Sequence, residues 1–290
     1  VSPVLGNKTL MEITTMDIAR LLKSIRDEGY AESTCEKVKK LLSQIYRCAI
    51  DNKYALENPT IGVPLPSYDK TANVVALSQR QQGLLLEYSE GRFYHNAYVV
   101  QCNTGLRTGE LAGLTRNDID LEHRIISVNK TLMYKRNSAG CYYAFHKPKT
   151  VTSERRIPIS DECYRAIENQ FKTKLELEQR FGSRMDEFAD LLFTTTRNTP
   201  LNASAYNSSL SKVEKAIRND GKDIIHLYGH ILRHTFATRC YEAGIKPKTI
   251  QSYLGHSSLQ MTMDIYTHLF QEFKSEEMAK LDDLNKKIVA

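Results

Sequence analysis

The sequence contains no run of about 18 apolar residues, and its start lacks the apolar core of a secretory signal. We therefore expect neither a transmembrane helix nor export, and we predict a cytoplasmic protein with no membrane partner. The six cysteines form no C-x-x-C pair, which indicates reduced structural thiols and argues against a zinc site. The sequence also lacks a P-loop and the acidic cluster that magnesium nucleases need. It thus predicts no metal and no cofactor.

What the chain does have is length and positive charge. Its 290 residues exceed most single domains, and 41% hydrophobic with 26% charged residues is ordinary for a globular protein. The formal net charge of +6 permits a polyanionic partner without establishing one. Lys37, Lys39 and Lys40 gather on the polar side of a predicted helix, where a solvated face and a phosphate-contacting face are both open.

Residues 1–66 predict a small all-helical domain. Gly29 ends a first amphipathic helix, and Ser33 with Glu36 forms a capping box that opens a longer one. The apolar face of this longer helix covers residues 38–50 at helical spacing. The pattern is that of a helical bundle.

Residues 67–76 predict a linker, because the sequence around them contains prolines and a glycine and no helical period. Residues 77–290 then predict a mainly α domain with a small antiparallel β-sheet, an α+β domain preceded by the all-α bundle. Helices are expected from Ser78 and over 94–102, 161–180, 209–217 and about 270–287, and strands over 125–132, 141–145 and 156–159.

Two cations of the second domain stand in turns. Arg107 lies between Gly105 and Gly109, in a tight turn that feeds a new helix. A helix start carries free N–H groups and positive potential, so an arginine there can meet a phosphate, although a plain surface turn has the same sequence. Lys149 is expected at the tip of a hairpin between the second and third strands, where an ammonium can reach into a groove or be solvated.

The segment 228–268 combines four residues that suit phosphoryl transfer. His230 and Arg233 are three residues apart, so on a helix both project from one face and can bind the same anion. His256 can supply a third donor, and the hydroxyl of Tyr266 is a potential nucleophile. Donors around an oxyanion beside a nucleophile describe a site for phosphoryl transfer.

Four motifs resemble those of a known family: TGLRTGELAGL around Arg107, HILRHTFATR around His230 and Arg233, LGHSS around His256, and MDIYTH around Tyr266. Their order and spacing are similar to those of the tyrosine recombinases of phages and transposons, and most of all to integrases of conjugative transposons. Residues 1–66 look like the core-DNA-binding domain of that family, and 77–290 like its catalytic domain. The resemblance implies a recombinase that excises or integrates a mobile element, with an arm-binding domain expected before Val1.

The resemblance also implies catalytic roles. Tyr266 would attack a scissile DNA phosphate and form a 3′-phosphotyrosyl link, which a second strand's 5′-hydroxyl then attacks. His230 would take the tyrosine proton, since an unperturbed tyrosine has a pKa near 10. Arg107 and Arg233 would neutralise the nonbridging oxygens, which is the work of metal ions in other phosphoryl-transfer enzymes.

The remaining roles fall to Lys149, which would protonate the leaving 5′-oxygen, and to His256, which would hold a nonbridging oxygen. Lys147 is the alternative for the lysine, because the hairpin varies in length within the family. The phosphotyrosyl ester conserves the bond energy, so the reaction needs neither ATP nor metal.

The expected partner is double-stranded DNA at the element ends and the target site. The family assembles as a dimer on each site and a tetramer in synapsis, so we expect a homo-oligomer held by the tail helix, with an accessory DNA-bending or excision protein as a further partner. The expected location is the bacterial cytoplasm, at the nucleoid. Two alternatives stay open: a type IB topoisomerase and a catalytically silent DNA-binding regulator. A metal hydrolase built on the eight histidines is set aside, because no metal-binding pair of histidines is recognised.

Overall fold

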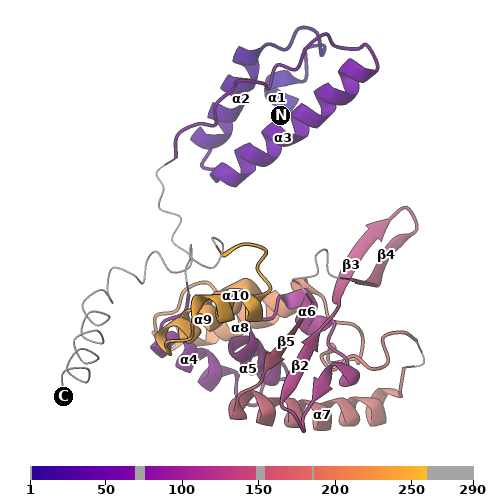
Figure 1. Cartoon of the computed structure of the whole chain (residues 1–290), viewed down its shortest axis with the longest axis vertical. Coiled ribbons are helices and arrows are strands. Elements are labelled where there is room, and N and C mark those ends of the chain that lie inside the picture. The colour runs from indigo at the N-terminus through magenta and orange to yellow at the C-terminus, as the bar shows by residue number, and fades with distance from the viewer. Residues whose placement is uncertain (1, 69–75, 148–153, 185, 260–290) are drawn as a thin grey trace, which may run out of the picture. The chain divides into compact units, whose positions relative to one another are not determined.

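The computed structural model describes residues 2–68, 76–147, 154–184 and 186–259. The chain divides into two compact units, Val1–Ala72 and Asn73–Ala290, and each is described by itself (Figure 1). Lys149, Tyr266 and the expected tail helix lie outside the described residues. No helix among the described residues is long and apolar enough to cross a membrane.

The described part of the first unit is all-helical, with α1 (Ser2–Leu5), α2 (Thr15–Asp27) and α3 (Glu32–Asp51). Thr14 caps α2 through a capping box with Asp17, and Gly29 follows its end with a φ of 85°. The predicted start of α3 is wrong. The helix begins before Ser33, with Ala31 at the N-cap and no side-chain cap, so Ser33 and Glu36 lie inside the helix.

A narrow apolar stripe joins α2 to α3. Cys35 and Leu42 of α3 share one buried cluster with apolar residues of α2. Tyr46, further along α3, is also buried, and its hydroxyl donates to the carbonyl of Leu10 at 3.0 Å. The predicted apolar face of α3 is too wide, since Leu41 is 55% exposed and other apolar residues on that side are exposed too. One neighbouring helix covers only part of the circumference of a 20-residue helix.

The second unit is mostly helical with two small antiparallel sheets, which confirms the predicted fold class. Its helices are α4 (Gln79–Ser89), α5 (His95–Thr104), α6 (Thr108–Ala112), α7 (Asp161–Phe181), α8 (Ala203–Asn219), α9 (Gly229–Glu242) and α10 (Pro247–Leu254), with the 3-10 turn η1 (Arg116–Asp118). Its strands are β1 (Ile119–Asp120), β2 (Ile125–Val128), β3 (Thr131–Asn137), β4 (Gly140–His146) and β5 (Arg155–Pro158).

Strands β1, β2 and β5 form one sheet, and β3 with β4 forms a separate hairpin that projects from the unit (Figure 1). The single strand predicted over 125–132 is therefore wrong. It breaks at Asn129 and Lys130, whose side chains both bind the buried carboxylate of Asp118. This polar anchor turns the chain out of the first sheet and into the hairpin.

Helix α5 is the centre of the second unit. It is buried along most of its length and packs against α7 on one side and α9 on the other (Figure 1). Inside this core the Tyr206 hydroxyl donates to Gln101 Oε1 at 2.8 Å, and Gln101 Nε2 donates to the carbonyl of Leu106 at 2.8 Å. A buried, satisfied hydrogen-bond chain of this kind fixes the turn that follows α5.

Candidate active site

Arg107 lies in a turn whose first residue, Gly105, must be a glycine. Gly105 ends α5 in the left-handed region with a φ of 63°, and a Cβ there would lie 2.4 Å from a ring carbon of Phe236 and 2.8 Å from a methyl of Leu254. Glycine is thus required both by the backbone conformation and by the close approach of α9 and α10. Arg107 follows as the N-cap of α6, and its side chain is 37% exposed.

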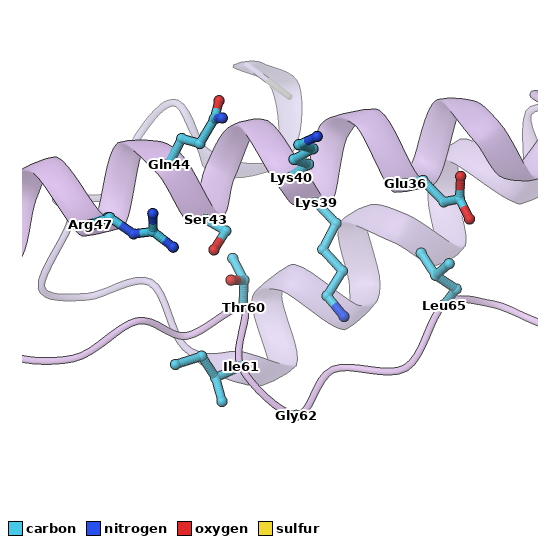
Figure 2. Close-up of a pocket in the computed structure, with 10 residues that line it drawn as sticks. All are labelled: Glu36, Lys39, Lys40, Ser43, Gln44, Arg47, Thr60, Ile61, Gly62 and Leu65. Carbon is cyan, nitrogen blue, oxygen red and sulfur yellow. The ribbon is translucent and has the colours of Figure 1, made fainter. Parts of the chain in front are cut away.

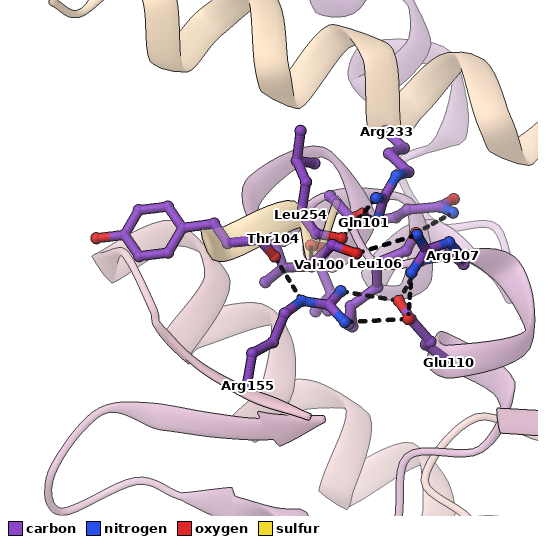
Figure 3. Close-up of polar contacts among 12 residues, drawn as sticks. Val100, Gln101, Thr104, Leu106, Arg107, Glu110, Arg155, Arg233 and Leu254 are labelled. Carbon is purple, nitrogen blue, oxygen red and sulfur yellow. Dashed lines mark hydrogen bonds and ion pairs between the residues drawn. The ribbon is translucent and has the colours of Figure 1, made fainter. Parts of the chain in front are cut away.

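One buried carboxylate organises the surroundings of Arg107 (Figure 3). Glu110, 5% exposed, accepts from the backbone N–H and from Nη1 of Arg107, each at 2.8 Å. It also accepts hydrogen bonds from Nη1 and Nη2 of Arg155, at 3.0 and 2.9 Å. Burial alone would raise the pKa of Glu110, but hydrogen bonds from Arg155 and the charges of both arginines lower it to about 2. The carboxylate is therefore ionised at neutral pH.

Arg233 projects from α9 into the same region. It is 2% exposed, and it donates to the carbonyl oxygens of Gly105 at 2.7 Å and Leu254 at 2.6 Å. Burial first, and then the charge of Arg107, lowers the pKa of Arg233 to about 9, which still leaves the guanidinium charged at neutral pH. Two of its nitrogens thus lock α9 to the ends of α5 and α10.

Three histidines around the arginines are neutral at pH 7. Burial, together with the charges of Arg233 and Arg107, lowers the pKa of His256 to about 4 and also lowers that of His230. Burial and the neighbouring His230 lower the pKa of His234 to about 4. A neutral imidazole can accept a proton, which an imidazolium cannot.

His230 and His234 stand at the i, i+4 spacing of many zinc-binding helices, which the sequence prediction overlooked when it set a metal hydrolase aside. Their rings lie 4.7 Å apart and nearly perpendicular. Among the described residues, no group of three or more His, Cys, Asp or Glu side chains is arranged to hold a metal ion. Within that part of the chain, the pair lacks the third ligand that a zinc site requires.

The structure brings four of the six predicted residues together: Arg107, His230, Arg233 and His256, from α6, α9 and the end of α10. Lys149 and Tyr266 lie outside the described residues, and the alternative Lys147 is exposed just after β4. The described strands that flank residue 149, β4 and β5, belong to different sheets. These two strands therefore do not form the hairpin that we expected around Lys149.

Sequence reasoning missed Glu110 and Arg155. Glu110 stands three residues after the N-cap Arg107, a capping-box spacing that the sequence contains. Arg155 shares the inward face of β5 with Ile157, since alternate residues of a strand point to the same side, and it is 8% exposed. The signal available in the sequence was the two-residue spacing from Ile157, which places Arg155 on the apolar face of the strand.

The first unit carries a separate polar groove of about 530 Å³ between α3 and the segment 60–65 (Figure 2). Its lining includes Lys39, Lys40 and Arg47 with polar neighbours and the acidic Glu36. The Lys39 ammonium donates to the carbonyl of Val63. The side chains of Lys40 and Arg47 make no hydrogen bond or ion pair with another described residue, so both cations are available to an anionic ligand.

Comparison with known families agrees with this geometry. The pattern of the phage integrase family matches residues 78–272, and that of the phage integrase central domain matches residues 1–63. The chain therefore belongs to the phage integrase family. This confirms the predicted enzyme class, a tyrosine recombinase acting in site-specific recombination of mobile elements.

Individual relatives point to transposons. The chain is 29% identical over 284 residues to the transposase from transposon Tn916 of Enterococcus faecalis, covering 96% of this chain and 69% of that protein. It is 25% identical over 276 residues to the ICEBs1 integrase of Bacillus subtilis (strain 168), covering 95% and 72%. The Tn1549 transposon integrase in complex with transposon right end DNA superposes with a TM-score of 0.78 at 28% identity, covering 96% and 88%. The predicted similarity to integrases of this type is confirmed.

Proposed function

We propose that this chain cleaves and rejoins DNA at the ends of a mobile element through a 3′-phosphotyrosyl intermediate on Tyr266. The observation that carries the proposal is the convergence of Arg107, Arg233 and two neutral histidines from three distant segments. Such a cluster can bind one phosphodiester by charge-assisted hydrogen bonds. Residues 1–66 serve as the core-DNA-binding domain, 67–76 as the linker and 77–290 as the catalytic domain.

The two arginines divide the work. Arg233 is buried, and two of its nitrogens already donate to carbonyl oxygens. It therefore contributes to phosphate binding mainly through a fixed positive charge and its remaining N–H groups. Arg107 is more exposed, and the hydrogen bond from its Nη2 to the carbonyl oxygen of Gly255 is long at 3.5 Å. Its guanidinium is thus the more available fork for the nonbridging phosphate oxygens.

His230 is the general base in this proposal. Burial and the arginine charges keep its imidazole neutral at pH 7, as proton abstraction from Tyr266 requires. His256 then holds a nonbridging oxygen through a ring N–H. Lys149, or Lys147 in its place, protonates the leaving 5′-oxygen, and no step needs a metal ion or ATP.

DNA binding extends to the groove of the first unit. Lys40 and Arg47 are exposed cations beside polar side chains that suit phosphate contacts. The DNA-bound Tn1549 integrase supports this partner for a chain that is 28% identical to it. Strand exchange between two duplexes needs several tyrosines, so the chain acts as a dimer on each site and a tetramer in synapsis, joined through the tail helix. The chain works with an accessory DNA-bending or excision protein, and it is located at the nucleoid.

Trapping on a nicked suicide duplex tests the chemistry. The nick releases a short strand after cleavage, so a covalent protein–DNA adduct accumulates on duplexes that carry candidate element ends. We expect an adduct with the wild-type chain and none with Tyr266→Phe. Arg107→Ala and Arg233→Ala should each slow adduct formation by on the order of 100-fold, or about 3 kcal/mol in the barrier. Magnesium-dependent cutting that leaves no protein on the DNA would refute the proposal.

A second assay separates a recombinase from the alternatives. A plasmid with two sites gives recombinant products if the chain exchanges strands. Relaxation without recombinants indicates a type IB topoisomerase. Binding without any adduct indicates a silent regulator.

A further inference from the structure

Three successive carbonyl groups at the end of α10 each accept a hydrogen bond from a different arginine. Arg155 Nε donates to the oxygen of Tyr253 at 2.6 Å, and Arg233 donates to that of Leu254 at 2.6 Å. Arg107 donates to the oxygen of Gly255 at the longer distance of 3.5 Å. The last carbonyls of a helix lack partners within the helix and carry negative potential, so cations are favourable there.

Arg155 differs from the other two arginines because all three of its nitrogens are used in contacts within the protein. Its Nη1 and Nη2 hold both oxygens of Glu110, and its Nε holds the backbone of α10, so all three nitrogens donate to protein groups. A direct role in binding the phosphate is therefore left to Arg107 and Arg233.

Glu110 connects Arg155 to Arg107. The same carboxylate that is held by the Arg155 fork accepts Nη1 and the backbone N–H of Arg107 (Figure 3). Without Arg155, only Arg107 itself would hold the carboxylate, and the Arg107 side chain would lose the independently fixed acceptor that sets its direction. The loop that starts at Gly255 and carries His256 would lose its tie to β5 at the same time.

We propose that Arg155 is a positioning residue of the recombination site: through Glu110 and the carbonyl of Tyr253, it holds Arg107 and the His256 loop in the geometry that binds the scissile phosphate. The role rests on the proposed phosphotyrosyl chemistry. A lysine cannot replace it, because one ammonium cannot hold two carboxylate oxygens and a carbonyl in the planar arrangement of a guanidinium.

The test measures single-turnover adduct formation on the suicide duplex for Arg155→Lys and Arg155→Met. We expect the rate to fall roughly 10-fold to 100-fold, as for other small misplacements of a catalytic group, while the Kd for the duplex stays within about twofold of wild type. Arg165→Met, which removes an exposed arginine of α7 outside this cluster, is the matched control and should leave the rate unchanged.

A double-mutant cycle distinguishes positioning from general destabilisation. If Arg155 positions Arg107 as well as the His256 loop, then Arg155→Lys should slow an Arg107→Ala protein several-fold less than it slows the wild type, because one of the two groups that it positions is already gone. An equal loss of rate in both backgrounds would overturn the proposal. So would a full wild-type rate in Arg155→Lys.

A measurement without DNA keeps this proposal separate from the proposed function. Arg155→Met should lower the melting temperature more in the wild-type background than beside Glu110→Gln. Only the ionised Glu110 is then a buried charge that has lost its two-nitrogen partner and keeps just the contacts from Arg107. Equal shifts would refute the Arg155–Glu110 contact, whatever the enzyme does. A coupled melting shift in a chain that forms no adduct would instead remove the phosphotyrosyl chemistry, and the positioning role with it.

Discussion

Replacing Gly105 by alanine should damage both the stability and the site, by an amount that the geometry allows one to work out. The backbone there has a φ of 63°, which costs a non-glycine residue about 1–2 kcal/mol. The new methyl would lie 2.4 Å from a Phe236 ring carbon and 2.8 Å from a Leu254 methyl. Overpacking of this kind adds about 1–3 kcal/mol. The expected loss in the free energy of unfolding is thus about 2–5 kcal/mol.

Gly91 provides the matched control. Its φ is 71°, so it has the same backbone requirement, but a Cβ there would meet nothing within 4 Å. Gly91→Ala should therefore lose only the conformational part, about 1–2 kcal/mol. Urea unfolding of the two variants measures the difference, which isolates the contact of the Gly105 turn with α9 and α10.

The same substitution should slow the chemistry. The carbonyl of Gly105 is one of the two that hold Arg233, and Leu254 carries the other. Pushing these segments apart would displace the guanidinium, so adduct formation at low temperature should fall by on the order of 100-fold. A Gly105→Ala variant that loses no more stability than Gly91→Ala would refute the close contact with α9 and α10. Adduct formation by the folded variant at the wild-type rate would contradict the displacement of Arg233.

Two further predictions concern pH and salt. His234 and His256 have pKa values of about 4 in the folded chain, below the ordinary value of 6.5. The unfolded chain therefore binds more protons between these values, and the unfolding free energy should fall as pH drops from 6.5 to 4, by on the order of 3 kcal/mol per histidine. A urea-unfolding series across this range checks it, and a flat profile would contradict the burial of neutral histidines. In the first unit, Lys40→Gln and Arg47→Gln should each reduce the slope of log K against log salt for duplex binding by about 0.9, whereas Lys37→Gln, outside the groove lining, should not.

Much of the fold could be predicted from the sequence because its helices are long and periodic. The helix expected over 161–180 is α7, Asp161–Phe181, and the one expected from Ser78 is α4, which Ser78 caps together with Gln81. The break in the predicted strand 125–132 could not be read locally. It depends on Asp118, a residue 11 or 12 positions away that draws the side chains of Asn129 and Lys130 toward it.

The candidate site divides in the same way. His230 and Arg233 are predictable because three residues place two side chains on one face of a helix. The contact between Glu110 and Arg155 spans 45 residues and joins a short helix to a strand, and no local period predicts such a pair. The motifs do not reveal the residues that hold the site in place, because those residues meet only through tertiary packing.

The charge balance of the site explains why this support is needed. Arg107 and Arg155 both pair with the buried carboxylate of Glu110, whereas Arg233 donates to carbonyl oxygens. Three arginine charges therefore surround one buried carboxylate. Burial and the repulsion from Arg107 lower the pKa of Arg233 accordingly. Carbonyl dipoles at the end of α10 offset part of this cost, and a phosphodiester would offset more. A ligand that binds only the folded chain stabilises it. In the proposed function, the excess positive charge that destabilises the free protein is thus the same charge that would bind a DNA phosphate.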